Sequence, residues 1–332
     1  MVNQVKRRRY FLPAAFLCAV ASSVSAQTTS DLTLKPWPAN SLAETLDTIV
    51  FQNKGDVRGE GQKAQVFWWD SFGRLHFDKQ DPQSPAIGYR YLTIDFDTRS
   101  RVLPDTLDEI SLAAGLHLGT IGGGDVTAVL GAGYSGDNLF ADANGIFGVG
   151  HLTYERRLGG DDFASDSLVL TLDYNGNSAF LPDVPLPGFA VVHREEALTY
   201  ALGFPASSLR WKISPELSLT LQYVVPYSGQ AVLEYKLAEH WSVFAEFANF
   251  FNGFEQDGHS REDRVFYQMR RVDAGVRFAD RQAFWGIGLD LAVVAGYAFD
   301  QDFSRGFDVR RLDHFAGISD EPYVGIVLRG WF

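Results

Sequence analysis

The last eleven residues of the chain alternate between two faces and finish on a bare aromatic side chain. Their order is Pro322-Tyr-Val-Gly-Ile-Val-Leu-Arg-Gly-Trp-Phe332, and a period of two is that of a β-strand. A half-apolar strand at the edge of a soluble protein invites aggregation. The same strand leaves no open edge if it pairs with the first strand of a barrel in a bilayer. The ending therefore favours a closed transmembrane barrel.

A terminal strand of this kind resembles the closing strand of bacterial outer-membrane β-barrels, which the outer-membrane insertion machinery recognises. The resemblance rests on alternating apolar residues and a final phenylalanine, namely Val324, Ile326, Leu328 and Phe332. It implies an outer-membrane location, with outer-membrane lipid and the insertion machinery as partners.

The start of the chain has the layout of a secretory signal peptide over residues 1–26. Lys6 and Arg7–Arg9 form a charged region, residues 10–20 are mainly apolar, and small residues precede Gln27. The apolar stretch is shorter than the roughly 20 residues that a spanning helix needs. We therefore expect this segment to be cleaved after export through the inner membrane.

Charge and cysteine content exclude several classes of function. Loss of the signal peptide would remove four positive charges and move the formal net charge from −12 to −16, which argues against nucleic acid as a partner. Cys18, the single cysteine, lies in that peptide, so no disulfide or thiol chemistry is expected. The histidines show no metal-ligand spacing, and we expect neither metal nor cofactor.

Residues 27–85 read as a periplasmic lead-in that can act as a plug. Ser41 and Glu44 have the spacing of a helix-capping box, which predicts a short helix over residues 41–51. A Gly- and charge-rich linker follows. The aromatic run at residues 66–69 fits either an interfacial segment or an additional strand.

Residues 86–332 are predicted to form an all-β, antiparallel up-and-down transmembrane barrel. Apolar and polar residues alternate over lengths near the 9–11 residues of a tilted membrane strand, and short and long connections take turns. A phase change at Pro205 is interpreted as a bulge within one strand, and the alternative is a tight hairpin there, which would add strands. The prediction is twelve strands, with ten or fourteen as alternatives.

The inward face of these strands is where functional side chains are expected, because outward charges cost roughly 2–4 kcal/mol each at mid-bilayer. Two interpretations stay open: a structural network across a narrow lumen, and a polar channel tuned by its charges. The predicted lumen residues are Asp95, His117, Asp173, Glu234, Lys236, Glu246, Arg271, Asp273, Arg277, Asp290 and Arg329.

Two other stretches were weighed as functional elements. His259-Ser260 lies in a polar, Gly-containing loop, where a solvated turn is favoured over a nucleophile–base pair. Residues 181–189 hold three prolines, a stiff segment that either folds into the barrel mouth or forms an ordinary external loop. This segment and the strands after it resemble uncharacterised bacterial proteins described only as outer-membrane barrels, which brings an architecture but no activity.

The sequence thus predicts an outer-membrane barrel that acts as a small passive pore or uptake channel for small solutes, with a partly charged lumen and no enzymatic activity. The alternatives are a sealed structural or surface-receptor barrel and an outer-membrane lipid-modifying enzyme.

Overall fold

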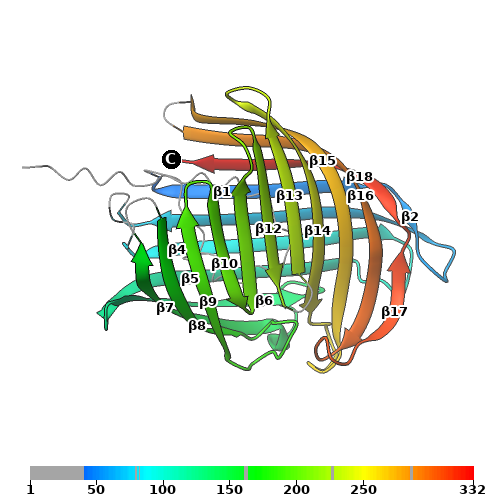
Figure 1. The fold of residues 1–332 in the computed structure, drawn as a ribbon. Coiled ribbons are helices and arrows are strands. Elements are labelled where there is room, and N and C mark those ends of the chain that lie inside the picture. The colour runs from blue at the N-terminus through cyan, green and yellow to red at the C-terminus, as the bar shows by residue number, and fades with distance from the viewer. Residues whose placement is uncertain (1–40, 79–80, 82, 161–163, 226–227, 285–286) are drawn as a thin grey trace, which may run out of the picture.

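The computed structural model describes residues 41–332 except 79–80, 82, 161–163, 226–227 and 285–286. The predicted signal peptide and residues 27–40 lie outside this range. Within it, sixteen strands form one closed antiparallel ring (Figure 1). The ring contains, in order, β1 (Ala43–Gln52), β3 (Lys63–His76), β4 (Ala86–Thr98), β5 (Thr106–Ile121), β6 (Gly124–Gly136), β7 (Ile146–Gly160), β8 (Ala164–Asn175), β9 (Leu186–Glu195), β10 (Leu198–Phe204), β11 (Ala206–Lys212), β12 (Leu217–Val224), β13 (Ser228–Lys236), β14 (Trp241–Phe254), β15 (Arg264–Phe284), β16 (Ile287–Gly306) and β18 (Glu321–Trp331).

The terminal strand closes the ring. On one edge β18 pairs with β16, and on the other it pairs with β1 through partners such as Ile49 and Ile326. Backbone hydrogen bonds of 3.0 and 3.1 Å between Phe332 and Ala43 finish the ladder. The predicted pairing of the terminal strand with the first strand of the barrel is confirmed.

Two short strands, β2 (Gly55–Asp56) and β17 (Asp313–Ile318), lie outside the ring at the end opposite the C-terminus (Figure 1). We call this end the outer end and the end that holds Phe332 the inner end. A 3-10 turn at Ala143–Gly145 is also at the outer end. Among the described residues, no helix has the length and hydrophobicity needed to cross a membrane.

The short N-terminal helix predicted for residues 41–51 is wrong, because this segment is strand β1. Glu44 faces the interior, whereas Ile49 faces outward. The edges of β3 and β18 both need hydrogen-bond partners, and β1 supplies them along its whole length. In a barrel wall that demand outweighs a local capping signal. The barrel accordingly starts at Ala43, ahead of residue 86, and residues 66–69 belong to β3.

The prediction of twelve strands, like its alternatives of ten and fourteen, is also wrong. Beyond β1 and β3, the chain reverses at Pro205 to make the hairpin of β10 and β11, so the preferred bulge is wrong and the alternative hairpin is the one formed. The sixteenth strand is β9, which was assigned to a loop because of its prolines. Phe189 is the first residue of β9 in chain order that pairs with β10, and Pro187 precedes it. The missing N–H of Pro187 therefore breaks no ladder on that edge.

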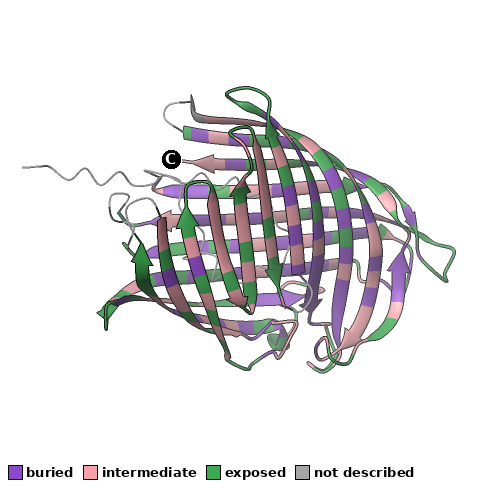
Figure 2. Cartoon of the chain, in the orientation of Figure 1, coloured by how far each residue is buried: buried purple, intermediate pink, exposed green. Residues whose placement is uncertain are grey.

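Buried and exposed residues alternate along the strands, as the striped ribbons of Figure 2 show. The exposed positions carry large apolar side chains around the ring, for example Leu116, Leu130, Leu221, Val293 and Ile326. A closed barrel whose outer face is apolar matches the pattern of barrels that face lipid.

Strand lengths differ sharply around the ring. β15 and β16 have 21 and 20 residues, whereas β10 and β11 have seven each and β12 has eight. Beyond Asn249, the last residue of β14 paired with β13, β14 continues with β15 alone up to Phe254. The wall is therefore lowest at the outer tips of β10–β13, which we call the notch.

The outer mouth is crossed by a direct link between opposite walls. β6 and β14 are eight positions apart in the ring of sixteen, yet Gly136 and Glu255 form a parallel β-bridge. Asp137 donates its backbone N–H to the Glu255 carbonyl at 3.0 Å. We call this contact the pinch. It divides the mouth into two halves.

The two halves differ in packing. On the side of β14–β18 and β1–β4, aromatic rings from facing strands meet inside the barrel. The ring centroids of Trp68 and Phe250 are 4.5 Å apart, and those of Phe96 and Tyr267 are 5.6 Å apart. These rings belong to one continuous apolar cluster, which we call the packed half. Along β7–β13, the hollow half, Ser208 on the inward face of β11 remains exposed, so solvent reaches the interior there.

Candidate binding site at the outer mouth

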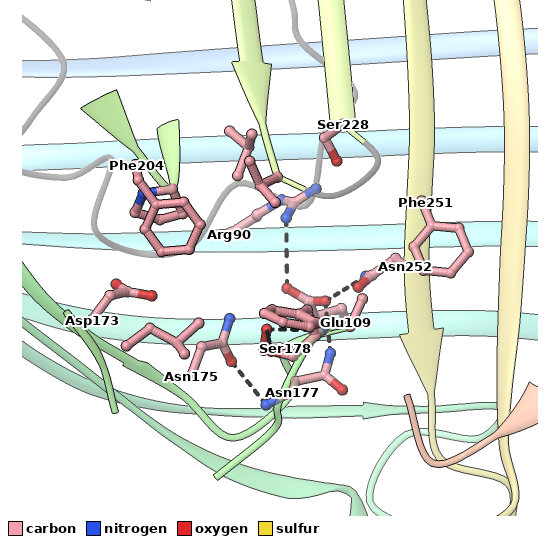
Figure 3. A pocket seen from close by; sticks show the side chains of 16 residues that line it. Arg90, Glu109, Asp173, Asn175, Asn177, Ser178, Phe204, Ser228, Phe251 and Asn252 are labelled. Carbon is pink, nitrogen blue, oxygen red and sulfur yellow. Dashed lines mark hydrogen bonds and ion pairs between the residues drawn. The ribbon is translucent and has the colours of Figure 1, made fainter. Parts of the chain in front are cut away.

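A cavity of about 100 Å³ lies at the outer mouth, beside the notch (Figure 3). It is lined by polar side chains, mainly from β4, β5, β8, β14 and the loop after β8, and by apolar side chains, several of them from the notch. The lining consists of Arg90, Glu109, Asp173, Asn175, Asn177, Ser178, Ala179, Phe180, Leu186, Phe204, Pro205, Val224, Val225, Ser228, Phe251 and Asn252.

The polar side of the cavity is built around Glu109. Asn252 and Asn177 donate side-chain N–H groups to Glu109 Oε2 at 2.8 and 3.2 Å. Arg90 lies 3.6 Å from Glu109 and 3.2 Å from Asp70. Since Glu109 and Arg90 each have a partner of opposite charge, this part of the polar side presents oriented amide and carboxylate groups that are already paired.

The apolar side comes from the hairpin tips of the notch. Phe204 and Pro205 stand at the turn between β10 and β11, and Val224 and Val225 stand at the end of β12. Phe204 and Val224 are also solvent-exposed, 39% and 38% respectively. A small molecule in the cavity would thus contact apolar groups on one side and hydrogen-bonding groups on the other, the usual composition of a ligand site.

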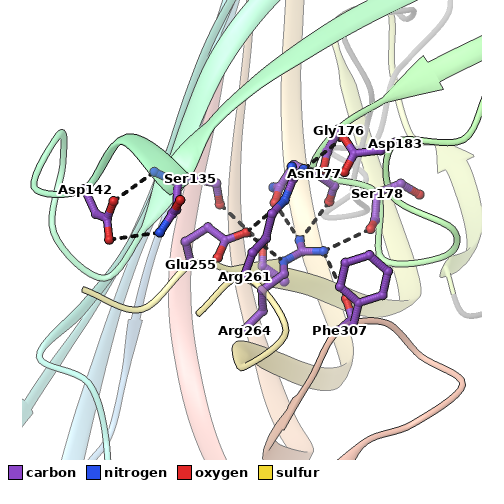
Figure 4. Close-up of polar contacts among 12 residues, drawn as sticks. Ser135, Asp142, Gly176, Asn177, Ser178, Asp183, Glu255, Arg261, Arg264 and Phe307 are labelled. Carbon is purple, nitrogen blue, oxygen red and sulfur yellow. Dashed lines mark hydrogen bonds and ion pairs between the residues drawn. The ribbon is translucent and has the colours of Figure 1, made fainter. Parts of the chain in front are cut away.

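The loop between β8 and β9 is fastened across the mouth by Arg264 (Figure 4). The Arg264 guanidinium donates to the Asn177 carbonyl at 3.0 Å, to Asn177 Oδ1 at 2.6 Å and to the Ser178 carbonyl at 3.2 Å. Arg261 adds a contact of 2.9 Å to Asp183, and Glu255 lies 3.6 Å from Arg264. We call these five residues (Asn177, Asp183, Glu255, Arg261 and Arg264) the latch. The latch holds residues 177–180 against the cavity.

The latch contains a titratable group beyond the end of β14. Burial raises the pKa of Glu255 from its usual 4.5 to about 7, although Arg264 and Arg261 act to lower it. Burial raises the pKa of Asp137, beside the pinch, in the same direction. A closed mouth therefore binds protons that an opened, hydrated mouth would release in this pH range.

This shift predicts a pH dependence of opening. The closed mouth should be most stable below about pH 4.5 and lose stability as the pH rises through 7, because more of the Glu255 population must then be buried in its charged form. Channel openings in planar bilayers should be more frequent at about pH 8 than at about pH 5. Glu255→Gln should flatten most of this response, with Asp137 supplying the remainder. A steeper response in Glu255→Gln would contradict the assignment.

Ten of the eleven predicted lumen residues lie on the inward face. Their pairing is dense in the packed half, where Arg271 contacts Glu246 at 2.5 Å and Asp273 at 3.1 Å. Arg277 contacts Glu234 at 3.0 Å. The ten inward residues are His117, Asp173, Glu234, Lys236, Glu246, Arg271, Asp273, Arg277, Asp290 and Arg329.

Asp95 is the exception, and its predicted place in the lumen is wrong. It is exposed on the outward face of β4, whereas Leu92, Ile94 and Phe96 point inward into the packed half. The phase of β4 was misread because its interior neighbours are apolar, so that hydrophobicity does not distinguish inside from outside.

The closing-strand residues occupy the lipid-facing side. Val324, Ile326 and Leu328 are exposed on the outward face of β18, and Phe332 is exposed at its end. The structure thus places the residues of the terminal pattern on one outer surface.

Several residues of the site were not predicted from the sequence. Arg90 and Glu109 sit on inward positions of β4 and β5, and Arg90 between Tyr89 and Tyr91 was a detectable signal. Asn177 and Arg264 are 87 positions apart in the chain, so no periodicity connects them.

Residues 259–260 lie in the loop between β14 and β15. His259 Nδ1 is 2.8 Å from Asp263 Oδ2, and both side chains are substantially exposed. Among the described residues, no group of three or more His, Cys, Asp or Glu side chains is arranged to hold a metal ion.

The proline-rich segment is divided between a loop and a strand. Leu181 and Pro182 belong to the latched loop, whereas Pro187 and Phe189 are part of β9. The portion that reaches into the mouth is residues 177–180, just ahead of the prolines.

Comparison with known proteins gives distant structural likenesses. No family model matches the chain, and no curated protein matches it. An outer membrane channel from Pseudomonas putida F1 is 11% identical, with a TM-score of 0.34 over 90% of this chain and 97% of that chain. A Pseudomonas aeruginosa FadL homologue is 11% identical, with a TM-score of 0.32 over 87% and 88%. The deltaS2 mutant of the TodX monoaromatic hydrocarbon channel is 9% identical, with a TM-score of 0.30 over 92% of each chain.

Proposed function

We propose that the chain forms a selective outer-membrane uptake channel, closed at rest, for small molecules that combine an apolar part with one polar group. The inner end, which carries both ends of the barrel, faces the periplasm, and the outer end faces the exterior. The apolar outward face supports the location in lipid. The proposal assigns no catalytic role to any residue.

The observation that carries the proposal is the combination of the mouth cavity with the hollow half behind it. The cavity offers a mixed polar and apolar lining, and inward positions of β11 beyond it, such as Ser208, stay accessible to solvent. A route for solute is therefore available along β7–β13. The latch and the pinch narrow its entrance, which favours a gated channel over an open diffusion pore.

A second candidate, the sealed structural or receptor barrel, is favoured by the packed half. Rings from opposite walls are in contact there, and they block that side of the lumen. A barrel of this kind could use only its outer loops.

Planar-bilayer recordings separate the two. For the selective channel we expect small, intermittent current steps in the native protein. Large, continuous current would point to an open pore instead. Silence over the whole range from about pH 5 to pH 8, in a protein that shows heat-modifiable migration and is therefore folded, would favour the sealed barrel.

A further inference from the structure

Asp173 lies in the lining of the mouth cavity, two residues before the end of β8. His151 Nδ1 is 3.0 Å from Asp173 Oδ1, and within the described part of the chain the carboxylate has no other hydrogen bond or ion pair. Figure 3 shows it apart from the Arg90–Glu109 pair, on the side of the cavity where Phe204 stands. Because the side chain is 21% exposed, its second oxygen, Oδ2, can accept a hydrogen bond from a ligand in the cavity.

The contact with His151 holds this carboxylate without neutralising its charge. Thr153 Oγ1 is 2.8 Å from His151 Nε2. Thr153 is buried, and its hydroxyl has no other partner among the residues that the structure describes. A buried hydroxyl proton without an acceptor is costly, so this hydroxyl donates to Nε2 and the ring donates its Nδ1–H to Asp173. The imidazole is then neutral, and Asp173 keeps its negative charge in a fixed orientation.

The charged residues of the lining and their direct partners are mainly acidic. Arg90 is the only cationic side chain among the described residues of the lining. It already lies 3.2 Å from Asp70 and 3.6 Å from Glu109. With Asp173, three carboxylates face one guanidinium at this end of the barrel. At short range they attract a cation and repel an anion.

The basic side chains of β7 and β11 lie further along the barrel. Arg157 is six residues from His151 on β7, and Arg210 is five residues from Pro205 on β11. At about 3.3 Å per residue these separations are roughly 17–20 Å. They exceed the Debye length of about 8–10 Å in physiological salt. The lining carboxylates therefore dominate the potential in the cavity.

Aromatic and aliphatic side chains complete the same lining. Phe180 and Phe204 contribute aromatic rings, and Leu186 and Val224 contribute aliphatic groups. The face of an aromatic ring attracts an ammonium group, and the aliphatic groups suit the apolar part of a ligand. A carboxylate beside aromatic rings thus matches an amine that carries an apolar substituent.

We infer that Asp173 binds the ammonium group of the transported molecule, so that the mouth cavity prefers small apolar amines over alcohols and carboxylates of the same size. This inference rests on the proposed function and names the polar group of its substrate. The ammonium donates a charge-assisted hydrogen bond to Asp173 Oδ2. The rest of the molecule contacts the apolar residues of the notch.

The test is equilibrium dialysis of the full-length mature protein in detergent with three probes of similar size: benzylamine, benzyl alcohol and benzoate. At neutral pH, where a primary amine carries a proton, benzylamine should bind about tenfold more tightly than the other two. Asp173→Asn should remove this preference and leave the affinity for benzyl alcohol unchanged. Asp173→Glu, which keeps the charge, should retain part of it. Heat-modifiable migration verifies that each variant is folded.

Asp166→Asn is the matched control. Asp166 is on the same strand and also contacts a histidine, His193, at 2.8 Å, but its side chain is 54% exposed and it lies outside the cavity lining. Its replacement should leave the binding of all three probes unchanged.

Equal binding of the three probes, or a native protein that binds no benzylamine, would overturn the inference. So would an equal loss of benzylamine binding in Asp166→Asn. If Asp173→Asn weakened benzyl alcohol as much as benzylamine, Asp173 would shape the cavity without selecting a cation, which also overturns it. A preference for benzylamine in a protein that stays silent in bilayers would reject transport while keeping the amine site.

Discussion

Replacing Arg264 with leucine is expected to open the outer mouth. The side chain is 1% exposed and donates to carbonyl groups of Asn177, Ser178 and Phe307. Its removal leaves these acceptors without their donor and leaves Glu255 with only the more exposed Arg261, 3.7 Å away, a loss of up to about 3–5 kcal/mol for a buried charged group. Chymotrypsin should then cut the loop between β8 and β9 at Phe180. Current steps in bilayers should become larger or longer.

Arg270→Leu is the control for this variant. Arg270 is on the same strand and pairs with Asp300 at 2.7 Å, but the two side chains are 44% and 47% exposed. An exposed pair of this kind contributes at most about 1 kcal/mol, so cleavage and current should match the native protein. If Arg264→Leu also left both unchanged, the latch would have no part in closing the mouth.

The closure of the barrel was predictable from the chain ending. Backbone groups in lipid must pair with one another, so a terminal strand such as β18 needs a partner on each edge, and it has β16 and β1. The outward positions of Val324, Ile326 and Leu328 follow from the same alternation. These features depend on local period and on a general constraint of the bilayer.

Strand number was not predictable because the deciding interactions are not local. Ser41 and Glu44 satisfy a helix-capping pattern, yet Glu44 is held in β1 by Arg74 on β3 and Arg329 on β18, 2.5 and 2.8 Å away. The hairpin at Pro205 joins strands of only seven residues, shorter than a spanning strand was expected to be. Each case is settled by a neighbour that lies far along the chain or by the low wall at the notch.

The site was predicted only in part for a related reason. In the hollow half, polar residues face in and apolar residues face out, so period-two reading assigns Asp173 and Lys236 to the interior. In the packed half the inward face of β4 is apolar at Leu92, Ile94 and Phe96, so the same reading places Asp95 on the wrong face. The latch escaped because Asn177 lies in a loop, and only the fold brings it to Arg264.

The second large effect is expected in the middle of the packed half. Arg271 contacts Glu246 at 2.5 Å and Asp273 at 3.1 Å, and its side chain is 6% exposed. Arg271→Met would leave two buried carboxylates without a cation, which costs about 3–5 kcal/mol. The guanidinium chloride midpoint, followed by tryptophan fluorescence in detergent, should fall accordingly. An exposed pair provides the control: Arg58→Met, which removes the 3.1 Å contact with Asp302, should shift it little.

Adding Glu246→Gln to Arg271→Met distinguishes a paired charge from a side chain needed for packing. The glutamine keeps the amide contact to Gln230, now 3.0 Å from Glu246, and removes one stranded carboxylate, so part of the lost stability should return. A double variant no more stable than Arg271→Met would mean that the loss comes from packing. An Arg271→Met protein as stable as the native one would mean that water already reaches these carboxylates. The packed half would then be a second aqueous route, and transport could no longer be assigned to β7–β13 alone.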